Sequence, residues 1–232
     1  MRKHYFLLVL LFLSLKHSYG LQTFKLSELF QYSISSAQIN NFKISTCKTD
    51  CLIYGVKLSV EGFPHSSQDG ETIKCAETTI WALMEYFGNK YAEYKPALPA
   101  KIHSALERFS YQRQLPSNGL TMDQISFALK EFGFGTRIYS EGAYGSELFK
   151  IIDSYVESGI PVIVGLQSGD IGHVIIAVGK ELSKEVYWDQ VDKSTIRIGD
   201  KDIEYFEYTN IPAKYVVQDD NHAPYRLIDL LK

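Results

Sequence analysis

The 232-residue chain, of which 45% is apolar, is long enough to build one good core and too short for two large domains joined by a long linker. Its 24 basic and 27 acidic residues are spread along the sequence and leave a net charge of −3, so there is no basic stripe that could follow a nucleic-acid backbone. We therefore expect one main domain with an N-terminal attachment, and no nucleic acid as a partner.

The N-terminal segment has two interpretations. Residues 1–20 combine a basic start, an apolar run from Tyr5 to Leu15 and a small residue at Gly20, which is the layout of a secretory signal cleaved after Gly20. Such a signal would make the protein secreted or periplasmic. Lys16 closes the run with a charge, however, and an eleven-residue apolar run also suits a buried strand or a core helix of a cytoplasmic protein. The run is too short to span a bilayer and no other segment approaches that length, so no membrane-spanning domain is expected.

The region that follows has strand character. Short pieces of alternating polar and apolar residues fill positions 21–60, and residues 52–60 have the β-branched enrichment of a strand. We expect an N-terminal β extension over residues 21–60, ahead of a main domain over residues 61–232. Residues 62–70 are dense in turn-forming residue types and predict a surface loop that leads into the next element.

The three cysteines, Cys47, Cys51 and Cys75, allow at most one internal disulfide, so one thiol must stay free. Cys47 and Cys51 lack the second pair of ligands that a structural zinc site needs. We therefore expect them to be ordinary strand or loop cysteines, or a disulfide pair if the protein is exported.

Four helices are predicted in the first part of the main domain. Apolar residues at the spacing of one helix face follow Cys75, which places this cysteine at a helix N-terminus, and Gly88 and Asn89 end the pattern. A second helix is predicted over residues 101–109. Thr121 and Gln124 form a capping box at the start of a third helix, which Gly133 ends, and a fourth helix is predicted over residues 146–158. The positions on the helix face after Cys75 are Ala76, Ile80, Leu83, Met84 and Phe87.

The character of the chain changes at Pro161, after which strands are predicted. The predicted strands cover residues 162–166, 173–178, 186–188, 195–198 and 215–217. Because helices come first and a meander of strands follows, the order of elements predicts an α+β fold.

Two residues carry the chemistry that the pattern suggests. The free N–H groups and the dipole at a helix N-terminus stabilise negative charge, which favours a reactive thiolate at Cys75, although a lone cysteine is often just a small core residue. His173 follows a glycine-rich turn and opens an apolar strand, where an imidazole can serve as a general base or as an ordinary structural residue. A helix-starting cysteine with a strand-starting histidine about a hundred residues later is the arrangement of Cys/His nucleophilic catalysis.

Three stretches, residues 67–81, 172–179 and 216–221, resemble the glutamine, cysteine, histidine and aspartate/asparagine blocks of papain-like cysteine peptidases. In pattern they are most similar to the double-glycine leader peptidases of bacteriocin exporters and to a group of uncharacterised bacterial proteins. The resemblance implies a papain-like α+β fold, in which a helical first half with the nucleophile at a helix N-terminus packs on an antiparallel sheet.

The same resemblance implies a role for each matching residue. Cys75 would be the nucleophile, His173 the base, and Gln68 a donor to the oxyanion of the tetrahedral intermediate, worth roughly 3 to 4 kcal/mol of barrier. Six residues separate Gln68 from Cys75, one more than in papain-like enzymes, so Gln68 could instead be structural. The orienting acid would be Asp219, with Asp220 as the alternative. Strand alternation predicts that only one of these two acids faces His173.

These residues predict a thiol peptidase that hydrolyses a peptide or isopeptide bond through a Cys75 acyl-enzyme. The alternatives are transglutaminase- or deamidase-like acyl transfer at the same site, and a non-catalytic papain-like binding module. A peptide or protein substrate is expected, and the sequence gives no indication of an oligomeric state. His65, His103 and His222 show no ligand spacing with one another and are expected to be solvated, so no metal ion and no cofactor are predicted.

Overall fold

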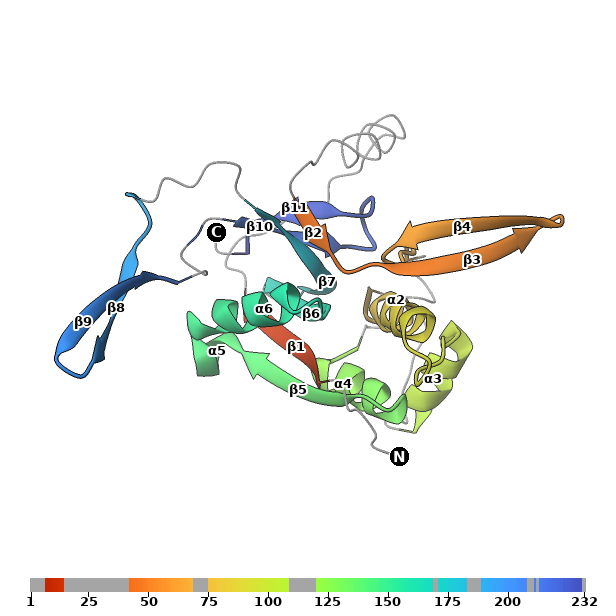
Figure 1. The fold of residues 1–232 in the computed structure, drawn as a ribbon. Helices are drawn as coiled ribbons and strands as arrows, with labels where there is room; N and C mark the ends of the chain where they lie inside the picture. Colours follow the sequence, from red (N-terminus) through yellow and green to blue (C-terminus); the bar gives the residue numbers. More distant parts are fainter. Residues whose placement is uncertain are drawn as a thin grey trace.

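The computed structural model describes residues 7–14, 42–68, 75–108, 120–168, 171–182, 189–207, 211 and 213–230. The chain has the mixed α+β architecture that the sequence predicts. A seven-stranded curled sheet carries helices on both faces, and two separate two-stranded ribbons extend away from the body on opposite sides (Figure 1).

The central sheet is largely antiparallel. Its strands are β1 (Leu7–Ser14), β2 (Phe42–Ile44), β5 (Gly135–Ser140), β6 (Val162–Ser168), β7 (Ile171–Leu182), β10 (Ala213–Gln218) and β11 (Arg226–Ile228). They follow the order β11-β10-β7-β6-β1-β5, and β2 pairs with β7 off this path. Pairs from β11 to β6 are antiparallel, whereas β1 is parallel to both β6 and β5. The predicted antiparallel arrangement thus holds around β7 and gives way to parallel pairing at β1.

Helices cover both faces of this sheet. They are α2 (Cys75–Lys90), α3 (Pro99–Glu107), α4 (Met122–Glu131), α5 (Glu141–Tyr144) and α6 (Glu147–Glu157). Because successive side chains of a strand point to opposite faces, β7 serves two cores. Its Val174 and Ile176 pack with α2, α3 and α4, whereas Ile175 and Ala177 pack with α6 on the other face. Burial on both faces explains the near-continuous apolar runs of β6 and β7.

The predicted helices are confirmed. The segments predicted at Cys75, 101–109, 121–132 and 146–158 form α2, α3, α4 and α6, with ends shifted by a few residues. The capping box before α4 is complete: the backbone N–H of Gln124 donates to Thr121 Oγ1 (3.2 Å), and the backbone N–H of Thr121 donates to Gln124 Oε1 (2.8 Å).

Most of the predicted strands are also confirmed. The segments 162–166, 173–178 and 215–217 lie in β6, β7 and β10, and the segment 195–198 lies in β8 (Lys193–Ile198). The segment 186–188 lies outside the described residues. The pattern did not predict β5, because five of its six residues are only half-buried or exposed and therefore form no apolar run.

The strand character predicted for residues 52–60 is confirmed, but the segment belongs to two strands because the chain reverses in the middle of it. β3 (Cys47–Ile53) and β4 (Val56–Gly62) form an antiparallel ribbon, and the φ angles of the connecting Tyr54 and Gly55 are 48° and 82°. Positive φ at both central residues is the signature of the type I′ turn, one of the favoured two-residue hairpin turns. A second ribbon joins β8 to β9 (Lys201–Phe206).

Cys47 and Cys51 are strand cysteines, and the conditional expectation of a disulfide between them is wrong. Four residues apart on β3, their Cα atoms are about 13 Å apart, which is beyond the reach of a disulfide, and Cys47 is a free thiol. The Cys47 side chain is buried at the root of the ribbon, and burial raises its pKa.

The N-terminal apolar run forms a strand in this structure. β1 lies between β5 and β6 and pairs with both, so it occupies an interior position of the sheet (Figure 1). The neighbouring extension is also joined to the sheet, since β2 pairs with β7 next to the end of β6. The expected boundary between residues 60 and 61 falls within β4. β1 and β2 thus tie the first part of the chain to the main domain.

Deleting residues 1–20 is therefore expected to abolish folding. Without β1, the hydrogen-bonding edges of β5 and β6 become free, and unpaired edges promote aggregation. The measurement is the yield of monomer in size-exclusion chromatography, together with the thermal unfolding transition, for the full chain and for the chain that begins at Leu21. A truncated protein that is monomeric and unfolds at the same temperature would contradict an essential β1 and would favour a removable signal.

Candidate functional site

The first residue of α2, the strand β7 and the turn after β10 meet at one side of the sheet. α2 packs on β7 because Ile80 and Leu83, on its apolar face, are fully buried in the same core as Val174 and Ile176. This packing places Cys75 at the N-terminal end of the helix, as the sequence predicts, with its side chain half-buried.

His173 contacts two of the residues predicted to act with it. Its Nε2 lies 2.9 Å from Asp219 Oδ1, and the Cys75 side chain lies close enough to the ring to influence its pKa. Burial alone would lower the pKa of His173. The hydrogen bonds and charges of Asp219 and Cys75 outweigh burial and raise the pKa to about 10. The ring therefore favours the imidazolium form at neutral pH, between a sulfur and a carboxylate.

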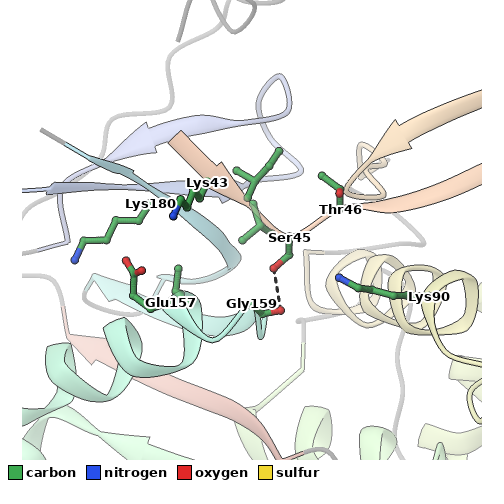
Figure 2. Close-up of a pocket in the computed structure, with 10 residues that line it drawn as sticks. Lys43, Ser45, Thr46, Lys90, Glu157, Gly159 and Lys180 are labelled. Carbon is green, nitrogen blue, oxygen red and sulfur yellow. Dashed lines mark hydrogen bonds between the residues drawn. The ribbon is translucent and has the colours of Figure 1, made fainter. Parts of the chain in front are cut away.

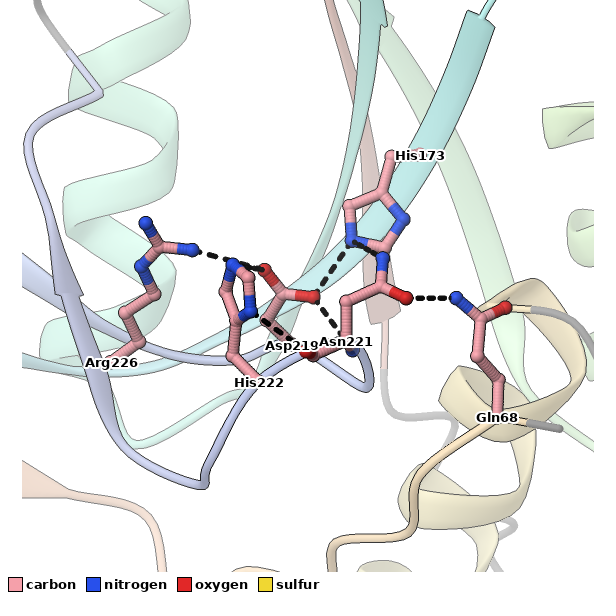
Figure 3. Close-up of polar contacts among 6 residues, drawn as sticks. All are labelled: Gln68, His173, Asp219, Asn221, His222 and Arg226. Atoms are coloured by element: carbon pink, nitrogen blue, oxygen red, sulfur yellow. Dashed lines mark hydrogen bonds and ion pairs between the residues drawn. The ribbon is translucent and has the colours of Figure 1, made fainter. Parts of the chain in front are cut away.

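Asp219 follows β10 directly and lies among two imidazole rings and the Arg226 guanidinium (Figure 3). Its Oδ1 also accepts the backbone N–H of Asn221 at 3.1 Å, and its Oδ2 lies 3.8 Å from both His222 Nε2 and Arg226 Nη1. Burial would raise the pKa of Asp219, but the hydrogen bond with His173 and the charges of His173 and His222 lower it. Asp219 thus remains ionised beside the ring that it contacts.

Asp220 also lies beside His173, so the prediction that only one of the two acids faces this residue is wrong. One ligand-type atom from each of His173, Asp219 and Asp220 lies within 4.8 Å of the other two. Strand alternation does not apply here, because β10 ends at Gln218 and both acids belong to the following turn. Burial, the largest effect, raises the pKa of Asp220 to about 6. Of the two acids, Asp219 makes the hydrogen bond to His173.

Gln68 reaches the same place from the loop before α2. Its side-chain amide donates to Asn221 Oδ1, and Asn221 Nδ2 lies 3.5 Å from His173 Nε2 (Figure 3). Residues 69–74, which join Gln68 to Cys75, lie outside the described residues. The structure thus brings Gln68 to the histidine and acid through Asn221, and its oxyanion role stays a prediction.

Sequence reasoning missed three members of this cluster: Asn221, His222 and Arg226. The expectation that His222 is solvated is wrong, since its ring is mostly buried and its Nδ1 lies 2.7 Å from the Asn221 backbone oxygen. His65 is not fully solvated either, because its side chain is half-buried and burial lowers its pKa. The sequence did hold one indication of two of these residues: Asn221 and His222 directly follow the acid pair Asp219 and Asp220. The contact with Gln68 spans 153 positions and no local pattern reports it.

A cavity of about 290 Å³ lies elsewhere on the molecule (Figure 2). Its lining comes from β2, β7 and the C-terminal ends of α2 and α6. Lys90, one lining residue, follows Cys75 by fifteen positions of α2, which corresponds to about 22 Å. The cavity is therefore separate from the Cys75 site. Its charged lining residues are Lys43, Lys90, Lys180 and Glu157, and Lys180 is paired with Asp153 at 2.9 Å.

Comparison with known proteins assigns no family: no family model, no curated protein and no solved structure matches the chain. Within the described part of the chain, no helix has both the length and the apolar character needed to cross a membrane. The functional argument therefore depends on the geometry around Cys75 and His173.

Replacing Asp220 with asparagine is expected to stabilise the metal-free protein at alkaline pH. With a folded-state pKa of about 6 against an ordinary 3.8, the stability that protonated Asp220 contributes is complete below pH 3.8 and is lost as the pH rises through 6. The neutral amide avoids this loss, so Asp220→Asn should gain roughly 1–3 kcal/mol at pH 8 and almost nothing at pH 4.

Urea unfolding at both pH values measures this difference, and Asp200→Asn, at an exposed turn, is the matched control. A gain of equal size at pH 4 and pH 8, or a loss at pH 8, would show that ionised Asp220 does not oppose folding.

Proposed function

We propose that this protein is a thiol hydrolase of papain-like architecture, which cleaves a peptide or isopeptide bond through a Cys75 acyl-enzyme. One observation carries the proposal: Cys75, at a helix N-terminus, lies beside His173, close enough to raise the pKa of its ring, and His173 Nε2 lies 2.9 Å from Asp219 Oδ1. A nucleophile, a base and a group that orients the base are the three parts of an activated nucleophile.

Each described side chain has a task in this mechanism. His173 holds the proton taken from the Cys75 thiol as its imidazolium form, and the Cys75 sulfur attacks the carbonyl carbon of the substrate. The C–N bond of the tetrahedral intermediate then breaks, and the leaving nitrogen takes the proton from the His173 imidazolium. A water molecule attacks the thioester, His173 accepts its proton, and the C–S bond breaks to restore the enzyme. Asp219 holds the ring in place and stabilises its charged form throughout.

The oxyanion of the intermediate needs donors close to Cys75. Backbone N–H groups in the first turn of α2 have no partner within the helix and are available for this purpose. A primary amide has two N–H donors, so Gln68 can bond to Asn221 with one and to the oxyanion with the other. The hydrogen bond to Asn221 would then position the Gln68 side chain and leave its second N–H free to bind the oxyanion.

The same side chains also serve acyl transfer to an amine or deamidation of a glutamine side chain. These reactions differ from hydrolysis in the acceptor that reaches the acyl-enzyme and in access of water, not in the cysteine, histidine and acid. A peptide or protein is the substrate class in each case, and the chemistry calls for no cofactor.

The test is the alkylation rate of each thiol with a limiting amount of iodoacetamide at pH 6, with the modified residue located by mass spectrometry. Cys75 is expected to react at least about tenfold faster than Cys47, because Cys47 is buried with a raised pKa, whereas Cys75 is half-buried beside His173. His173→Ala should remove this advantage, and His103→Ala, on the exposed side of α3, should leave it intact.

Two outcomes would overturn the proposal. If Cys75 reacts no faster than Cys47, the site does not activate its thiol, and the non-catalytic binding module becomes the better account. If Cys75 reacts rapidly but equally well in His173→Ala, the histidine is not its partner. Comparable unfolding temperatures of the variants exclude loss of folding as the cause of either result.

A further inference from the structure

The residues around His173 form a second kind of arrangement besides the Cys75–His173 pair. His173 from β7, with Asp219 and Asp220 from the turn after β10, presents one nitrogen and two carboxylate oxygens, each within 4.8 Å of the other two. Both carboxylates are at least nine-tenths buried, so solvent does little to separate their charges. One imidazole and two carboxylates at this spacing are the side chains that hold divalent transition metals in proteins.

Asp220 lacks the partners that a buried carboxylate needs. It is 9% exposed, and within the described part of the chain neither of its oxygens accepts a hydrogen bond of ordinary geometry, although the Thr78 hydroxyl lies near enough to affect it. Leaving a buried carboxylate uncompensated costs several kcal/mol, so such groups are paired, protonated or bound to a metal. Asp219, in contrast, is already held by His173 and the Asn221 backbone.

We propose that His173, Asp219 and Asp220 form a binding site for a divalent transition metal ion, with Zn²⁺ the best match. Ligand atoms that lie 2.0–2.2 Å from tetrahedral Zn²⁺ are roughly 3.3 Å apart. His173 Nε2 and Asp219 Oδ1 are 2.9 Å apart, so they need to separate by less than half of one ångström to bind the ion together. The Asp220 carboxylate, which has no hydrogen-bond partner of ordinary geometry among the described residues, would supply the third ligand atom. Ca²⁺ fits poorly, because it takes six to eight oxygen ligands, and Mg²⁺ fits poorly, because it requires an octahedral set of oxygens.

Cys75 is not one of the three ligands. The proposed site therefore differs from a simpler one in which the Cys75 thiol and the His173 imidazole chelate the ion. A metal can bind Nε2 only after the imidazolium releases its Nε2 proton to solvent, and the remaining ring proton then sits on Nδ1, the nitrogen left to face Cys75. His173 then has no lone pair with which to accept the thiol proton. Metal binding itself is independent of the proposed hydrolase activity, whereas inhibition by metal depends on it.

The test is equilibrium dialysis of the full chain against Zn²⁺ at pH 7, with a competing chelator, for the wild-type protein and three variants. We expect one tight site in the wild-type protein, an affinity at least about tenfold lower in Asp220→Asn, and no change in Cys75→Ala. Asp200→Asn is the matched control and should also bind as the wild-type protein does. Far-UV circular dichroism checks that each variant is folded.

Co²⁺ in place of Zn²⁺ gives a second readout that does not depend on stability. The complex should show the visible d–d bands of a four-coordinate ion without a thiolate-to-metal charge-transfer band. Equal affinity in Asp220→Asn means an adventitious ion only, and a charge-transfer band that disappears in Cys75→Ala means a thiol–imidazole chelate. Either result overturns the proposed ligand set. Alkylation of metal-free protein still reports on the hydrolase proposal, so the two can fail separately.

Discussion

The hydrogen bond between His173 Nε2 and Asp219 Oδ1 joins the interior strand β7 to the turn that follows β10, and the rest of the site is arranged around it. β7 and β10 are neighbours in the sheet, so the backbone pairing of these strands determines where both side chains lie. Because the bond is mostly buried, it holds the ring in one orientation and leaves the other edge of the ring, toward α2, for the Cys75 side chain. Any chemistry at this site depends on that orientation.

The sheet that fixes this bond is itself assembled from distant parts of the chain. β7 pairs with β6 on one side and with β10 on the other, and β2 continues the β6 side beyond Gly179. At Gly179 a Cβ atom would lie 2.0 Å from the backbone oxygen of Lys43, so only glycine allows β2 to approach. β1 then joins β6 to β5. The catalytic candidates lie on a scaffold that needs both the N-terminal and the C-terminal segments.

The features that could be predicted from the sequence are those with local causes. The apolar stripe after Cys75, the Thr121–Gln124 capping box and the apolar runs of β6 and β7 each depend on residues within a few positions of one another, and all are present. The candidates Cys75 and His173 were found in the same way, as residues at the starts of predicted elements, whereas Asp219 was suggested by the resemblance to papain-like peptidases.

The features that were missed depend on contacts between distant segments. The parallel pairing of β1 with β5 and β6 depends on how distant strands assemble into the sheet, and the local sequence pattern of β1 does not reveal it. The position of Asp220 depends on β10 ending at Gln218, which moves the acid from the strand into a turn where alternation no longer applies. Residue periodicity also cannot show that Asn221 contacts both Gln68 and His173. These contacts join the loop before α2 to the turn after β10 and to β7, which are distant in sequence.

The central claim is that Cys75, His173 and Asp219 act as one unit, and the most direct measurement of it is the titration of the His173 ring by ¹⁵N NMR in metal-free protein. In the wild-type protein the ring should keep its second proton up to a pKa of about 10. That pKa should fall in Cys75→Ala and fall further when Asp219→Asn is added, because each change removes one of the charges that raise it. A ring that titrates near 6.5 in the wild-type protein, or a pKa that neither substitution changes, would contradict the account.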